Sequence, residues 1–190
     1  MGVVSTTSAP RPVTDPLSIV ALETERHVAA SGWDQPVRLF ALVETTHLLE
    51  HEPGFLDALQ PHDTRPGSLT AVEQEDLPSP DHLESMLAQI TWPDAVVGAA
   101  IAVERIVVPP GAEHDLPADA EEALARLAAH PERKDVRLLV AVLRDGSHTC
   151  LLRQRDHDRD DRVAQGAEIA PGLVHGLLAT FADDAGSTAT

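Results

Sequence analysis

The chain has 190 residues, a formal net charge of −17 and a hydrophobic fraction of 43%. This length and apolar content predict one folded domain with a substantial core. The negative charge repels phosphate, so it argues against nucleic acids and anionic membranes as partners. Aromatic residues make up only 3% of the chain, so the core is expected to be aliphatic and the surface poorly suited to base stacking.

The sequence also predicts a cytoplasmic location. Cys150 is the single cysteine, which excludes an intrachain disulfide and suits a reducing compartment. No apolar run approaches the ~20 residues that span a bilayer. The first residues lack the basic and apolar regions of a signal peptide. We therefore expect no membrane partner.

The N-terminal half predicts a helix followed by strands and short helical pieces. Residues 1–14 are rich in Ser, Thr and Pro and are expected to be a disordered lead-in. Asp15 is a suitable N-cap for a helix that begins at Pro16 and ends near Gly32. The elements expected next are a strand at 37–43, a short helix at 45–52, an edge strand at 69–75 and a helix that ends at Ile90, capped by Ser79 or Asp81.

The C-terminal half predicts the centre of the sheet. A strand at 96–108 carries small residues on one face, which lets a helix pack closely, and a bulge or the sheet margin is expected at Glu104-Arg105. A helix at 117–130 follows. Residues 171–182 predict the last helix, and 183–190 are expected to be a flexible acidic tail.

The strongest local signal is Asp145-Gly146, which lies between two β-rich runs at 136–155. With these two residues as the turn, Leu143 is expected to pair with His148 and Ala141 with Cys150.

The predicted order of elements is α-β-β-α-β-α-β-β-α. This order indicates a single α+β domain over 15–182, with a mixed or mostly antiparallel sheet of about five strands and helices packed against it.

Several separated motifs together carry a family resemblance. They are Trp33-Asp34-Gln35-Pro36 with the strand at 39–43, and the segments 73–75, 92–93, 130–132, 136–146 and 155–158. They resemble a family of small acidic actinobacterial proteins that has no assigned function, over Leu17 to Phe181. The resemblance implies a cytoplasmic α+β domain and supplies no catalytic residue. The element order is also similar to that of small bacterial secretion-chaperone-like domains, a fold analogy that carries no function.

One candidate metal site is the charged loop that contains Asp156, His157, Asp158 and Asp160. Carboxylates and an imidazole this close in sequence can hold a divalent cation. The loop lacks the glycine and the final glutamate of an EF-hand, and interleaved arginines partly neutralise its carboxylates. A solvated loop is therefore the favoured interpretation.

A second candidate metal site is His47 with His51, which share one helix face with Glu50 and Glu52 nearby. This i, i+4 spacing occurs in zinc hydrolases. The glutamate is misplaced relative to HExxH, and the sequence shows no third ligand. Structural or surface histidines are therefore favoured.

The remaining reactive residues predict no catalysis. His148 and Cys150 lie on one face of one strand, at ~6.5–7 Å along the backbone, which is too far apart for a thiol–imidazole pair. No catalytic or cofactor-binding motif is present, and no cofactor is expected. Trp33 and Trp92 are candidate interface residues if exposed, and core residues otherwise.

The favoured hypothesis is a non-enzymatic cytoplasmic protein-binding or adaptor domain, which contacts an unidentified protein partner through an open sheet face or edge. The alternative is a metal-dependent or small-molecule enzyme that uses His157, Asp158 and Asp160, or His47 and His51. Self-association into a homo-oligomer is a third hypothesis.

Overall fold

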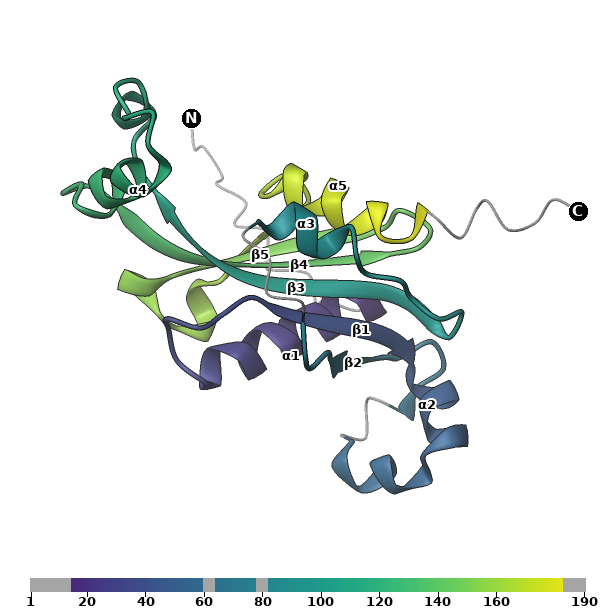
Figure 1. The fold of residues 1–190 in the computed structure, drawn as a ribbon. Helices are drawn as coiled ribbons and strands as arrows, with labels where there is room; N and C mark the ends of the chain where they lie inside the picture. Colours follow the sequence, from purple (N-terminus) through teal and green to yellow (C-terminus); the bar gives the residue numbers. More distant parts are fainter. Residues whose placement is uncertain (1–14, 60–63, 78–81, 183–190) are drawn as a thin grey trace, which may run out of the picture.

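The computed structural model describes residues 15–59, 64–77 and 82–182. The expected lead-in at 1–14, the expected caps Ser79 and Asp81, and the tail at 183–190 lie outside these residues. The fold is a six-stranded antiparallel sheet in the order β2-β1-β3-β4-β5-β6, with helices on both faces (Figure 1). The predicted α+β class is confirmed, and the sheet has one strand more than expected.

The elements follow the predicted order closely. The strands are β1 (Arg38–Glu44), β2 (Leu69–Glu73), β3 (Val96–Val107), β4 (Lys134–Leu143), β5 (His148–Gln154) and β6 (Ala164–Gly166). The α-helices are α1 (Pro16–Ala30), α2 (Thr45–His51), α3 (Leu83–Leu87), α4 (Ala120–Ala128) and α5 (Pro171–Ala179). Short 3₁₀ helices are η1 (Pro53–Ala58), η3 (Pro110–Glu113), η4 (Arg155–His157) and η5 (Asp160–Arg162).

Helix α1 begins where its cap predicts. The Asp15 carboxylate accepts a hydrogen bond from the Ser18 N–H at 2.8 Å, and Pro16 occupies the first turn. The helix ends before Gly32, whose φ of +84° is a left-handed conformation that glycine adopts without strain. Its apolar side, which includes Val20 and Val28, is buried against the sheet.

Both faces of the central strands are covered (Figure 1). Helix α1 packs on the face that carries the small residues Ala100 and Ala102, as their size predicted. Helices α3 and α5 pack on the other face, where the core includes Val140 and Leu177. In the part of the chain that the structure describes, the central strands therefore lack the open sheet face that the sequence led us to expect. The edge strands β2 and β6 remain as the parts of the sheet where a partner strand could pair.

Strands β3 and β4 continue beyond their neighbours. Strand β1 stops pairing with β3 at Ala102, whereas the β3–β4 ladder is unbroken as far as Val107 opposite Lys134. Glu104-Arg105 is therefore neither a bulge nor the margin of the sheet, because both residues pair with β4 and only β1 has ended; a register shift is found instead at Leu42/Val43. We call residues 105–135 the arm. It projects from the body of the domain and carries η3 and α4 (Figure 1).

The β4–β5 hairpin exists, but its predicted register was wrong by one residue. Its loop contains three residues, because Gly146 N–H donates to Leu143 O and Leu143 N–H donates to Ser147 O. Gly146 has a φ of +91°, which is typical of a type I turn followed by a left-handed residue. Val140, and not Ala141, therefore pairs with Cys150. A shift of one residue moves each side chain to the opposite face.

Strand β6 was not predicted. Its three residues, Ala164–Gly166, pair with β5 at the sheet edge. Ala, Gln and Gly have low β propensity and show no alternation, so only pairing with β5 makes this segment a strand.

Candidate functional site

A row of charged residues lies on the α1 face of the sheet, next to the apolar core. On β4, Leu139 belongs to the core and Arg137 is two residues before it, on the same face. Arg137 is flanked across the strands by Glu104 of β3 and Arg153 of β5. The sheet thus changes from apolar to ionic under the C-terminal half of α1.

Arg153 is the centre of this network. Its side chain is 2% exposed and makes a bidentate pair with the buried Glu25 of α1, at 2.6 and 2.7 Å. It also bonds Asp158 at 3.0 Å and Asp160 at 2.7 Å. The hydrogen bonds to Glu25 are the largest reason why the pKa of Arg153 is raised. The guanidinium therefore stays charged and joins α1 to β5 and the following loop.

Arg137 lies beside it and is incompletely paired. Its Nη2 donates to Glu104 Oε1 at 2.9 Å and to the Gly32 carbonyl. Its guanidinium lies 4.3 Å from the centroid of the Trp33 ring, a cation–π distance. Nε and Nη1 are buried and have no hydrogen-bond partner among the described residues.

Trp33 links the two most distinctive sequence motifs. Its Nε1–H donates to Asp158 at 2.9 Å, across 125 residues of sequence, and this bond is the largest reason why the pKa of Asp158 is lowered. Asp34 accepts two hydrogen bonds of 2.9 Å from Arg155. The motifs that carry the family resemblance, at 33–36 and 155–158, therefore meet at one site.

The loop that is a candidate metal site in the sequence, and is favoured there as a solvated loop, is largely engaged in ion pairs. Asp158 and Asp160 bond Arg153, and Asp156 lies 3.1 Å from Lys134 Nζ. Within the described ranges, no group of three ligands suited to a metal includes these aspartates or His157. The sequence indicated that these carboxylates lie close together. It could not show that Arg153 of β5 lies among them and pairs with Asp158 and Asp160.

The second candidate metal site, His47 with His51, has Glu50 as a possible third ligand. One ligand atom each of His47, Glu50 and His51 lies within 4.8 Å of the others, on the exposed side of α2. His51 Nδ1 lies 2.9 Å from the His47 carbonyl oxygen. Because a carbonyl only accepts, Nδ1 is the donor in this contact, and in the neutral tautomer Nε2 is the nitrogen that can bind a metal.

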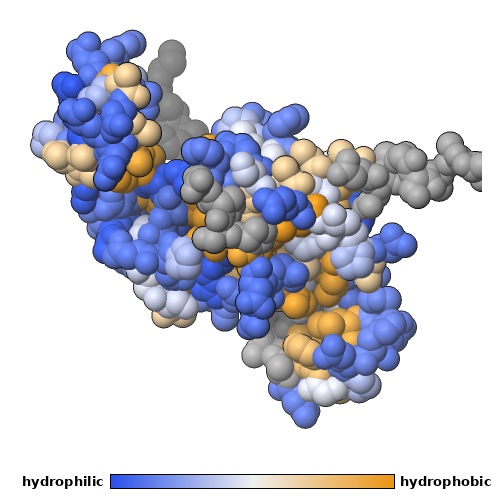
Figure 2. All heavy atoms as spheres, in the orientation of Figure 1, coloured by the Kyte–Doolittle hydropathy of each residue, from blue (hydrophilic) through white to orange (hydrophobic). Residues whose placement is uncertain are grey.

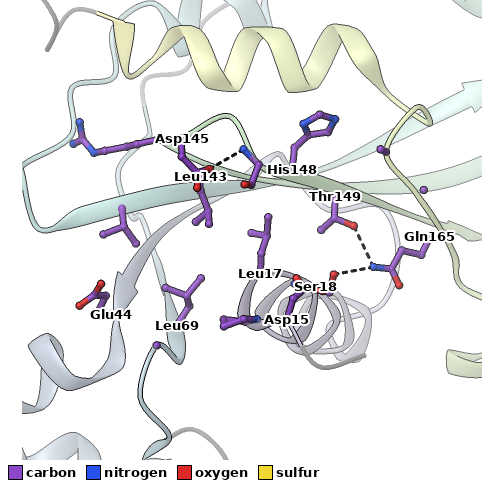
Figure 3. Close-up of a pocket in the computed structure, with 17 residues that line it drawn as sticks. Asp15, Leu17, Ser18, Glu44, Leu69, Leu143, Asp145, His148, Thr149 and Gln165 are labelled. Atoms are coloured by element: carbon purple, nitrogen blue, oxygen red, sulfur yellow. Dashed lines mark hydrogen bonds between the residues drawn. The ribbon is translucent and has the colours of Figure 1, made fainter. Parts of the chain in front are cut away.

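A cavity of about 750 Å³ lies at the opposite end of the α1 face (Figure 3). It is bounded by the N-terminus of α1, the β4–β5 hairpin, the start of β2 and the region of β6. Sequence reasoning missed it, because its walls come from segments that are far apart in the chain and carry no shared motif.

The comparisons with known proteins agree with the motif resemblance. A family model described as PPA1309-like protein matches residues 17–182. The chain belongs to the PPA1309-like protein family. The expected family resemblance is thereby confirmed as membership of this family, whose description states no activity. Comparison with curated proteins and with solved structures gave no significant match.

The arm of this PPA1309-like chain exposes apolar side chains. Helix α4 has no buried residue, and its Leu124 is 63% exposed. On the adjoining strand, Ile106 is 38% and Val107 48% exposed. Apolar side chains exposed on one projecting segment are candidates for a protein interaction surface. Figure 2 shows hydrophobic atoms on the arm within a mainly hydrophilic surface.

Trp92 of the PPA1309-like chain is a core residue and not an interface anchor. It is 5% exposed, it donates to Thr180 Oγ1 at 2.8 Å, and it stacks on Phe181 with the ring centroids 5.9 Å apart. Trp33, the other interface candidate, is half-buried beside Arg137. In the part of the chain that the structure describes, no helix has the length and apolar character needed to cross a bilayer.

Cys150 and His148 do not form a catalytic pair. Cys150 Sγ faces the Ala167 carbonyl oxygen at 3.8 Å, and His148 Nδ1 contacts the Gly146 carbonyl oxygen at 3.0 Å. Burial raises the pKa of the Cys150 thiol, so the reactive thiolate is disfavoured.

Proposed function

We propose that this chain is a non-enzymatic, cytoplasmic protein-binding domain and that the arm contacts its partner. The observation that carries the proposal is α4, a helix that has no fully buried residue and whose Leu124 is 63% exposed, whereas Ala123 and Leu127 are half-buried. Its apolar positions follow helical spacing: Ala120, Ala123, Leu124 and Leu127. Burial of such a strip normally stabilises a helix this short, because isolated helices of fewer than about 12 residues are marginal in water. A partner that covers Leu124 would supply that burial.

The charged network supports the proposal by fixing the base of the arm. Glu104 and Arg137 are the residues at which the two-stranded extension leaves the sheet, and they are paired at 2.9 Å. Glu104 also accepts the Asp34 N–H at 2.9 Å. A surface that is held in place before binding loses less conformational entropy when the partner docks.

The charge around α4 indicates the chemistry of the partner. Glu121 and Glu122 lie in its first turn, and Asp119 caps the helix by accepting the Glu122 N–H at 2.9 Å. An apolar patch edged by lysine or arginine would complement this acidic border.

The test is a quantitative co-purification from the source cells with the native chain and Leu124→Glu in parallel. We expect the amount of co-purified protein to be at least about tenfold lower with Leu124→Glu than with the native chain, because the substitution places a charge in an apolar contact. The control is Leu56→Glu, an equally apolar residue that is 55% exposed in η1, outside the arm. Both variants should keep the native melting temperature, since neither side chain is buried.

Retention of the partner by Leu124→Glu, or its equal loss from both variants, would contradict the assignment to the arm. The solution mass of the purified chain distinguishes self-association into a homo-oligomer from binding of a different protein. A dimer that Leu124→Glu dissociates would show that the partner is a second copy of this chain.

Metal binding at His47, Glu50 and His51 is a second candidate function, favoured by the convergence of three ligand atoms. Imidazole and carboxylate ligands suit zinc, and three protein ligands leave a position open for substrate or water. We expect tag-free protein to bind one Zn²⁺ in a calorimetric titration. Binding should weaken at least about tenfold in His51→Ala and stay unchanged in the control His114→Ala. Equal binding by both variants, or none by the native chain, would contradict this candidate.

A further inference from the structure

The cavity in Figure 3 exists because α1 is shorter than the sheet it covers. The helix begins at Pro16, and the sheet continues beyond this point towards the β4–β5 hairpin. The uncovered strip is the floor of a cavity of about 750 Å³. Pockets that hold small molecules typically enclose ~300–1,000 Å³ and are mainly apolar with a few polar groups.

The body of the cavity is apolar. Leu17 of α1, Leu69 of β2 and Leu143 of β4 approach it from different sides (Figure 3). All three also belong to the α1-side core or pack against it. An apolar ligand here would extend the existing core, and each Å² of apolar surface removed from water contributes roughly 25 cal/mol.

The rim of the cavity carries carboxylates from three separate segments: Asp15, Glu44 and Asp145. Asp15 and Asp145 each use one oxygen to accept a backbone N–H, from Ser18 and Ser147, at 2.8 Å. The bond from Ser147 is the largest reason why the pKa of Asp145 is lowered, so this carboxylate is charged at neutral pH. Asp15 is left with one oxygen, Oδ1, outside this bond, whereas Asp145 also interacts with the Ser147 side chain.

The inner polar wall also presents an acceptor. Gln165 Nε2 donates to Ser18 Oγ and to Thr149 Oγ1, both at 3.2 Å (Figure 3). These two bonds occupy the amide N–H groups and orient the side chain. The carbonyl Oε1 of Gln165 is therefore its remaining group for a ligand.

The basic lining residues are directed elsewhere. Arg144 Nε donates to the Val96 carbonyl at 2.6 Å, and its guanidinium lies over the Phe181 ring on the α5 side of the sheet. The His148 ring stands on the far side of the hairpin from Leu17 (Figure 3). The cavity is thus lined by apolar groups and hydrogen-bond acceptors, with negative charge at its mouth.

We propose that this cavity binds a small organic cation with an apolar body. The ammonium or guanidinium head pairs with one carboxylate of the rim and is attracted by the charge of the other two, and the apolar body lies against Leu17, Leu69 and Leu143. A hydrogen bond from a charged donor to a carboxylate is stronger than a neutral one, and the other rim charges add longer-range attraction. The site is separate from the arm, so its occupancy does not depend on the protein-binding proposal.

The test compares two probes of equal chain length and opposite charge, octylamine and octanoate. Binding to the full chain is followed by ¹H–¹⁵N NMR titration. We expect octylamine to shift the amide signals of Leu17, Leu69, Leu143 and Thr149, and octanoate to bind at least about tenfold more weakly, because its carboxylate meets like charge.

A variant that removes two rim charges, Asp15→Asn with Glu44→Gln, should weaken octylamine binding at least about tenfold. Asparagine caps helices as well as aspartate does, so α1 is expected to stay intact. The control removes two charges outside the cavity, Glu84→Gln with Glu121→Gln, and should leave the affinity unchanged. This control separates the site from attraction to the net negative chain.

Equal binding of octylamine and octanoate would overturn the proposal. So would equal weakening in the rim variant and the control, or shifted signals that lie outside the cavity. Absence of octylamine binding by the native chain would also overturn it. None of these results would bear on partner binding through Leu124.

Discussion

Arg153 shows how a cation is accommodated inside this domain. Its guanidinium reaches Glu25, Asp158 and Asp160 at once, which a lysine ammonium on a flexible stem does not reproduce. Removing one partner of a buried pair typically costs about 3–5 kcal/mol, because the other charge is left unpaired. The network therefore makes the junction of α1, β5 and the 155–162 loop dependent on its charges.

At the same scale, Asp158 gives a prediction of pH dependence. Its pKa is lowered, first by the hydrogen bond from Trp33 and then by Arg153. A lowered folded-state pKa means that the carboxylate stabilises the fold above its ordinary pKa of about 4, and that this contribution is lost as the pH falls through the folded value.

We therefore expect Asp158→Asn to be less stable than the native chain at pH 7, by no more than about 1 kcal/mol because the side chain is partly exposed. The difference should shrink towards zero at pH 3. Urea unfolding at both pH values measures it. A gap that stays constant between pH 7 and pH 3 would show that the lost stability comes from packing, and Glu121→Gln in α4 serves as the comparison variant.

At the scale of elements, the sheet depends on one close approach of backbones. Gly98 of β3 pairs with Leu42 on one side and with Leu143 on the other. A Cβ atom at this position would overlap the Val142 carbonyl oxygen and lie 2.7 Å from Leu143 Cδ2. Because the contact is with backbone in the centre of the sheet, it cannot be relieved by a side-chain rotation.

Gly98→Ala is therefore expected to destabilise the fold by about 1–3 kcal/mol, as overpacking does in other cores. Gly172→Ala is the matched control, since nothing lies within 4 Å of its Cβ position in α5. That variant should change the free energy of unfolding by less than about 1 kcal/mol, in the stabilising direction because alanine favours helix. Equal effects of the two substitutions in urea unfolding would refute the predicted overlap.

Local sequence signals predicted the elements well because they act over a few residues. The Asp15 cap, the Pro16 start and the small residues of β3 each specify a local conformation or a packing distance. The hairpin register was missed because Asp145-Gly146 fits both a two-residue and a three-residue loop. Packing of the core selects the three-residue loop, because only the observed register pairs Leu151 with Leu139 and buries both on the face of the sheet that α1 covers.

On the scale of the whole molecule, the domain presents different chemistry at its two ends. One end carries the arm with exposed Leu124, fixed at its base by the charged network. The other end carries the acceptor-lined cavity at the N-terminus of α1. The apolar η1 segment, with Phe55 39% and Leu56 55% exposed, is a third surface feature. This separation allows partner binding and small-molecule binding to be tested independently.

The sequence by itself determined the fold class, the order of most elements and the motifs that mark the family, because capping, periodicity and turn chemistry are encoded within short windows. The tertiary structure decided which distant residues meet. It placed Trp33 beside Arg137 and Asp158, made β6 a strand and opened the cavity beyond α1. These outcomes depend on strand order and on the length of α1 relative to the sheet, which are set by packing of the whole chain and not by any local pattern.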